Sequence, residues 1–69
     1  MPGTVDVALS PRQHEVLVLL SRGVRAREIA VELGVAQATA RNHIRDVLRR
    51  LDCHSQLEAV VRARQCRLL

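Results

Sequence analysis

The sequence predicts an all-α fold, a small four-helix bundle, and three observations support this prediction. Apolar residues recur at the spacing of a helix face in four segments after residue 9. Serines stand where two of these segments begin, and glycines follow two of them, as is typical of helix caps. The chain has 69 residues, enough for one small domain, and no Phe, Tyr or Trp. Its core must therefore consist of Leu, Val, Ile and Ala side chains.

Residues 1–8 are predicted to form a flexible N-terminal arm, and residues 9–69 to form the folded domain. The arm has no sustained hydrophobic period and contains a proline and a glycine near its start. The first helix is then expected from Pro11 to about Ser21.

The ends of this first helix are well specified. Ser10 is a typical N-cap, Pro11 suits the first helical position, and Gln13 can complete a capping box. Gly23 follows the last turn, where glycine commonly ends a helix. The face that is expected to point into the core holds Val16, Leu17 and Leu20.

The next two segments have the pattern of a helix-turn-helix, with Gly34 in the turn. Helices are expected over about Ala26 to Leu33, with Arg25 as a weak N-cap, and over Gln37 to about Leu51. A small residue, Ala30, lets two crossing helices approach closely, and Gly34 accepts the left-handed backbone of a tight turn. In the first of these two helices the residues expected to be buried are Ile29, Ala30 and Leu33.

The helix after the turn has one apolar face and one polar face. The apolar stripe consists of Ala40, Ile44, Val47, Leu48 and Leu51. A rotation of about 100° per residue brings a different set to the outer side. This outer set is Ala38, Arg41, Asn42, Arg45 and Arg49. Small, basic and amide side chains can approach the base edges of a DNA duplex.

The last helix is expected to begin with a capping box at Ser55 and Glu58 and to continue to about Cys66. The residues expected to face the core are Leu57, Val60 and Ala63. The apolar arc is wider than one core contact requires, and the surplus predicts a contact with a second subunit. The predicted dimer contact consists of Ala59, Val61 and Cys66.

The positive charge lies in the second half of the chain. All eleven basic residues are arginines, and the formal net charge is +4. Residues 1–35 hold four arginines and four acids, whereas residues 36–69 hold seven arginines and three acids. A polyanion is therefore the expected partner of the second half, and arginine can bind a phosphate or a guanine edge through two hydrogen bonds. Without aromatic residues on which bases could stack, duplex DNA is favoured over single strands.

Other functional classes find no support in the sequence. Cys53 and Cys66 have no paired C-x-x-C spacing and suit a reducing cytoplasm, so a cytoplasmic location with free thiols is expected. Together with His43 and His54 they match no zinc-binding pattern, and no metal or other cofactor is expected. No glycine-rich phosphate loop or nucleophile motif occurs, so no catalytic residues are assigned and an enzyme is not expected. The chain lacks a long apolar run, and its amphipathic helices lack the Trp or Phe of a membrane border.

The chain resembles the LuxR-type (GerE-like) helix-turn-helix domain of bacterial transcription regulators. The resemblance runs in register from about Leu9 to the C-terminus and includes Gly23. It is carried by LSPRQHEVL (residues 9–17), REIAVELGV (27–35), TARNHIRDVLRRL (39–51) and SQLEAV (55–60). The sequence departs from the family pattern at Ala36, which lacks a capping oxygen, at Ala40, and at Asp52, where the family has glycine.

The resemblance implies a bundle-like fold, similar to a winged helix without the wing, and sequence-specific binding to promoter DNA. The helix after the turn would enter the major groove, and the last helix would form the contact of a homodimer. This dimer could be one that forms only when both copies are bound to DNA. By position, the base contacts would be Arg41, Asn42 and Arg45. The backbone contacts would be Arg27, Gln37, Thr39 and Arg49.

Two questions stay open at the level of the sequence. The residues before Ser10 are too few to form the input domain of such regulators, so the chain is either a fragment or a stand-alone regulator. The alternative to a DNA-binding regulator is a protein-interaction module without an input domain, which pairs with another regulator through the last helix.

Overall fold

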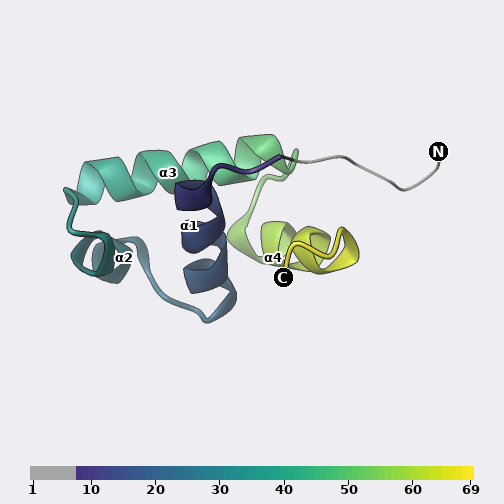
Figure 1. Ribbon diagram of the computed structural model, residues 1–69, viewed down its shortest axis with the longest axis horizontal. Helices are drawn as coiled ribbons and strands as arrows, with labels where there is room; N and C mark the ends of the chain where they lie inside the picture. The colour runs from purple at the N-terminus through teal and green to yellow at the C-terminus, as the bar shows by residue number, and fades with distance from the viewer. Residues whose placement is uncertain (1–7) are drawn as a thin grey trace.

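The computed structural model describes residues 8–69, which form four α-helices joined by short turns (Figure 1). The helices are α1 (Pro11–Ser21), α2 (Ala26–Leu33), α3 (Gln37–Arg50) and α4 (Gln56–Gln65). The described range contains no strand, so the predictions of an all-α fold and of a domain without a wing are confirmed. The helices begin and end within one residue of the predicted bounds. The predicted arm lies outside the described residues, except for Ala8.

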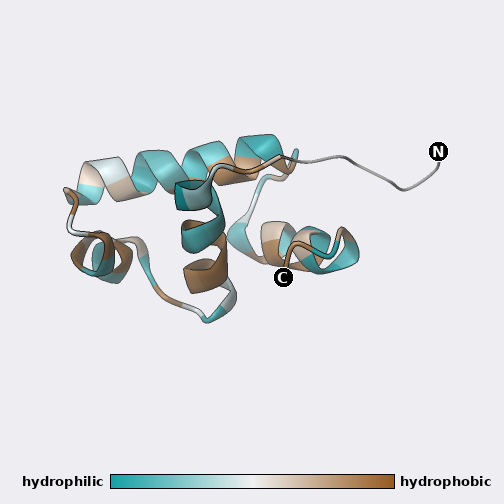
Figure 2. Ribbon diagram, viewed as in Figure 1, coloured by the Kyte–Doolittle hydropathy of each residue, from teal (hydrophilic) through white to brown (hydrophobic). Residues whose placement is uncertain are grey.

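The core is built around α3, because each of the other helices packs against it. In Figure 1, α1 and α2 lie on the same side of α3, and α4 lies beside α1. The side of α3 that faces α1 carries its apolar residues, as the hydropathy colouring shows (Figure 2). The largest fully buried side chains are Val16, Leu17, Ile29, Val47 and Leu51. Full burial of one such side chain contributes about 1.5–3 kcal/mol relative to leaving it exposed.

Helices α1 and α4 each begin after a serine whose side chain caps the helix N-terminus. In the capping box of α1, the N–H of Gln13 donates to Ser10 Oγ (3.1 Å) and the N–H of Ser10 donates to Gln13 Oε1 (2.9 Å). In α4 the N–H of Glu58 donates to Ser55 Oγ (3.1 Å). The Glu58 carboxylate, however, accepts from the N–H of His54 (2.7 Å) and not from that of Ser55. The second hydrogen bond of the predicted capping box is therefore made by the residue before the N-cap.

All four helices end in the same hydrogen-bonded motif. After α2, the N–H of Gly34 donates to the Val31 carbonyl (3.2 Å) and the N–H of Val35 to the Ala30 carbonyl (2.9 Å). These two bonds define a Schellman motif, which requires a left-handed residue at its centre. That residue is Gly23 after α1 (φ 78°), Gly34 after α2 (φ 66°), Asp52 after α3 (φ 55°) and Arg67 after α4 (φ 59°).

The orientation of α4 corrects part of our prediction. Ala59, which we expected at a dimer contact, is fully buried, and Leu57, which we expected in the core, is 74% exposed. The buried residues of α4 are Ala59 and Ala63. The face of α4 that packs against α1 and α3 therefore carries two small side chains. Ala59 is therefore wrong as a dimer contact, because no part of it is exposed.

Two side chains connect α4 and the C-terminus to the rest of the domain. Arg62 Nη1 donates to the Leu51 carbonyl (3.1 Å) and to the Asp52 carbonyl (3.4 Å). The ring Nε2 of His14 on α1 lies 3.0 Å from the Leu68 carbonyl. Arg62 thus holds α4 against the turn that follows α3 and donates to carbonyls that make no hydrogen bond within the helix.

Candidate nucleic-acid interface

The turn at Gly34 determines how α3 is presented. Its left-handed backbone ends α2 and reverses the chain, so that α3 begins only three residues later, at Gln37. Ala30 on α2 and Ala40 on α3 are both buried in the core to which the two helices contribute. The burial of Ala30 and Ala40 and the left-handed conformation of Gly34 are as the sequence predicts.

The outer face of α3 exposes the three residues predicted to read bases. Ala40, Ile44 and Val47 are buried, so the rotation of the helix turns Arg41, Asn42 and Arg45 outward, and all three are exposed. Arg45 Nη1 donates to Asn42 Oδ1 at 3.5 Å, a long and weak hydrogen bond. Within residues 8–69, neither Arg41 nor Arg45 forms an ion pair. Their guanidinium groups therefore keep most of their donors free for another partner.

The residues predicted to hold phosphates surround this face. Gln37 and Thr39 are exposed in the first turn of α3, and Arg49 is exposed in its last turn. Arg49 Nη1 lies 3.8 Å from Asp46 Oδ1, in a pair that is largely exposed and therefore weak. Arg27 is exposed in the first turn of α2 and lines a shallow hollow with Arg25 and Glu28.

The first turn of α3 also offers unpaired backbone donors. Ala36 has no side-chain acceptor, and no side chain caps the start of α3. The first N–H groups of a helix have no partner within the helix and carry its partial positive charge. An anion such as a phosphate can supply the acceptor that Ala36 lacks.

The cysteines and the apolar surface of α4 are the other groups singled out by the sequence. Both cysteines are free, Cys53 in the core and Cys66 partly exposed. Within residues 8–69 no cluster of three His, Cys, Asp or Glu side chains could hold a metal ion, and no helix could cross a membrane. Val61 is 48% exposed and lies one turn after the exposed Leu57.

Sequence reasoning missed the most exposed large apolar side chain among residues 8–69. Val31 on α2 is 81% exposed. It lies off the face formed by Ile29, Ala30 and Leu33, and this helical position was the signal that could have identified it. Val31 lines a shallow hollow with Arg27, Glu28 and Glu32.

Comparisons with known proteins agree with this geometry. The family model of bacterial regulatory proteins of the luxR family (GerE) matches residues 7–63. The chain is 38% identical over 57 residues to the probable HTH-type transcriptional regulator GfsR of Streptomyces halstedii, covering 83% of this chain and 24% of the relative. It is 37% identical over 57 residues to the transcriptional regulatory protein DesR of Bacillus subtilis, covering 83% of this chain and 29% of the relative. The predicted family resemblance is therefore confirmed.

A solved structure shows the same fold. The response regulator ChrA of a heme-sensing two-component system superposes with a TM-score of 0.86 at 31% identity, covering 99% of this chain and 34% of that chain. The chain thus spans about a quarter to a third of the length of these relatives.

Proposed function

Because the chain belongs to the luxR family of bacterial regulatory proteins, we propose that it binds promoter DNA sequence-specifically and thereby regulates transcription. The observation that carries the proposal is the exposed face of α3. Arg41, Asn42 and Arg45 lie there within two helical turns, with no acid paired to either arginine among residues 8–69. A helix presented in this way after a tight turn suits the major groove of a duplex.

Base reading is assigned to Arg41, Asn42 and Arg45. An arginine can donate two hydrogen bonds to O6 and N7 of guanine, and an asparagine can pair with N6 and N7 of adenine. In the free chain the amide of Asn42 accepts weakly from Arg45, and this bond is long enough to be exchanged for bonds to bases.

Backbone contacts are assigned to Arg27, Gln37, Thr39 and Arg49. Arg27 lies in the first turn of α2, and Gln37 and Thr39 lie beside the uncapped N–H groups of α3. A phosphate at the start of α3 would satisfy these donors and set the depth at which the helix enters the groove. Arg49 would reach a phosphate further along the same groove.

We also infer that two copies pair through α4 when both are bound to DNA. The support is the pair of exposed apolar residues Leu57 and Val61, which lie one turn apart. Cys66 lies seven residues after the buried Ala59 and therefore on the opposite side of the helix from Leu57. Ala59 takes no part, because it is buried in the core.

Three single substitutions test the assignment of base and backbone contacts. We expect Arg41→Ala and Arg45→Ala each to cost about 1–3 kcal/mol on the preferred site and to relax the preference at one base pair. Arg27→Ala should weaken binding to all duplexes equally and reduce the slope of log K against log salt by about one unit. The measurement is fluorescence anisotropy with a duplex selected from a random library, its two single-base variants and a scrambled duplex, at two salt concentrations.

The result that contradicts the proposal is equal, sequence-independent loss for all three substitutions. Helix α3 would then make electrostatic contacts alone, and the alternative of a protein-interaction module would be favoured. Arg22→Ala is the matched control, because Arg22 is an exposed arginine that we assign to neither class of contact. It should leave the sequence preference unchanged.

A further inference from the structure

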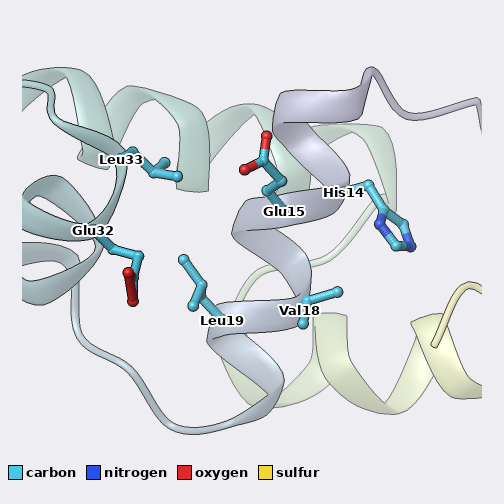
Figure 3. Close-up of a pocket in the computed structure, with 6 residues that line it drawn as sticks. All are labelled: His14, Glu15, Val18, Leu19, Glu32 and Leu33. Carbon is cyan, nitrogen blue, oxygen red and sulfur yellow. The ribbon is translucent and has the colours of Figure 1, made fainter.

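A groove between α1 and α2 plays no part in the proposed contact with DNA. Its volume is about 350 Å³, and it opens to solvent. The residues that line it are His14, Glu15, Val18, Leu19, Glu32 and Leu33 (Figure 3). We propose that this groove is a docking site for a basic amphipathic helix of a protein partner, an interaction that goes beyond the proposed function.

The floor of the groove is apolar and incompletely covered. Val18, Leu19 and Leu33 are half-buried, and Figure 3 shows Leu19 of α1 and Leu33 of α2 directed toward the space between the two helices. Glu32 lines this groove and also the neighbouring hollow that contains Val31. Arg27 lines that hollow too, so the apolar floor of the groove ends at Glu32 and consists of Val18, Leu19 and Leu33. An apolar helix face laid across this surface would remove it from water.

The charge of the groove identifies the class of partner. The chain has eleven arginines, yet none of the six lining residues is an arginine, whereas two are glutamates. Glu15 lies 3.9 Å from Arg12 in an exposed pair, which neutralises it weakly. Glu32 forms no ion pair within residues 8–69. The groove therefore repels a nucleic acid and attracts a partner that carries lysines or arginines beside its apolar residues.

A partner in this groove leaves the outer face of α3 accessible. The lining residues come from α1 and α2, which pack on the inner side of α3. The base-reading residues Arg41 and Arg45 point to the opposite side. DNA and a protein partner can therefore be bound at the same time, and failure of one interaction does not imply failure of the other.

The test uses the full 69-residue chain, labelled with ¹⁵N, and two synthetic helical peptides. Both peptides carry leucines at i, i+4 and i+7, and their flanking positions are lysine and arginine in one peptide and glutamate in the other. We expect the basic peptide to shift the backbone amide resonances of α1 and α2. We expect the acidic peptide to leave these resonances in place.

Two variants connect the interaction to the groove. Glu15→Gln and Glu32→Gln are each expected to weaken binding of the basic peptide about two- to fivefold, the effect of losing one exposed ion pair. Asp46→Asn, which removes a carboxylate from α3, is the matched control and should not change the affinity. Circular dichroism establishes that each variant is folded.

Three outcomes would overturn the proposal. These are equal binding of the acidic peptide, peptide-induced shifts confined to α3 or α4, and an affinity that Glu32→Gln leaves unchanged. Shifts of the groove resonances with chain concentration alone would show that a second copy, and not a basic partner, occupies the groove. Binding of the duplex, measured in the same samples, reports separately on the proposed function.

Discussion

Cys53 and Cys66 differ in environment although both are free thiols. Cys53 is buried, and its Sγ donates to the Leu51 carbonyl at 3.3 Å, whereas Cys66 is partly exposed at the end of α4. Burial raises the pKa of the Cys53 thiol above its ordinary value of 9.0. The nearby charge of Arg62 opposes this rise, and those of Glu58 and Asp52 add to it. The reactive thiolate of Cys53 is therefore disfavoured in the folded chain.

We expect Ellman's reagent at pH 8 to titrate one thiol rapidly, that of Cys66, and the second thiol only as fast as the chain unfolds. Since the folded pKa of Cys53 is raised, its contribution to stability is fully present below pH 9 and is lost as the pH rises through the folded value. Cys53→Ala should abolish this part of the alkaline loss, measured by urea unfolding between pH 8 and 10.5. Equal rates for both thiols would contradict the assignment, and Cys66→Ala is the control that identifies the rapid one.

At the scale of the elements, the helix ends differ in how well their residues suit them. Gly23 and Gly34 adopt the left-handed conformation without a steric penalty, whereas Asp52 and Arg67 adopt it with a side chain attached. A left-handed residue other than glycine costs about 1–2 kcal/mol. The motif persists after α3 and α4 because Cys53 and Leu68, which follow these residues, pack into or against the core.

Substitutions at two of these positions should therefore have opposite effects on stability. A Cβ at Gly34 meets no atom within 4 Å, so Gly34→Ala is expected to cost about 1 kcal/mol from the backbone alone. Arg67→Gly should gain about 0.5–1 kcal/mol, because the relief of the left-handed conformation exceeds the added entropy of the unfolded chain. Arg67→Ala is the control for loss of the side chain and should be nearly neutral. Thermal unfolding measures all three, and a stabilising Gly34→Ala would refute the explanation.

The sequence was sufficient to predict the helix bounds but not the rotation of α4. Local groups decide the bounds, because Ser10, Gly23 and Gly34 act on the backbone next to them. The face of α4 that is buried depends on how α4 packs against α1 and α3, and this packing buries Ala59 and leaves the larger Leu57 exposed. Hydrophobicity alone predicts the opposite, because leucine is more hydrophobic than alanine.

The difference between local and tertiary structure also decides which residues of the candidate sites could be identified from the sequence. Arg41, Asn42 and Arg45 could be placed on one face because a single helix carries them all. The groove could not be predicted, since Glu15 and Glu32 belong to different helices whose packing brings them together. Arg62 gives no sign in the sequence that it bonds to carbonyls eleven and ten residues earlier.

At the scale of the whole molecule, charge and apolar surface are separated among the helices. Exposed arginines occupy the outer face of α3, the two carboxylates of the groove lie on α1 and α2, and two exposed apolar side chains, Leu57 and Val61, lie on α4. Such a separation lets one small domain contact different partners with different faces. The contact between α4 helices is expected to be the weakest of these.

The area available to α4 explains this weakness. A stable interface buries roughly 800 Å² per partner. That area would be about a sixth of the 4896 Å² surface of this chain, more than Leu57 and Val61 supply. Two copies held on one duplex have a high effective concentration, which compensates for a small contact. Assembly should therefore depend on a duplex that carries two half-sites.

We expect sedimentation velocity to find a monomer in the absence of DNA and two chains per duplex when two half-sites are present. The double substitution Leu57→Ser and Val61→Ser should abolish the cooperative binding of the second chain, because it removes both exposed apolar side chains of α4 without touching the core. Val31→Ser removes an even more exposed apolar side chain from α2 and should leave the cooperativity intact. A wild-type chain that fills the two half-sites independently would show that α4 makes no contact between copies, while leaving the reading of each half-site by α3 unaffected.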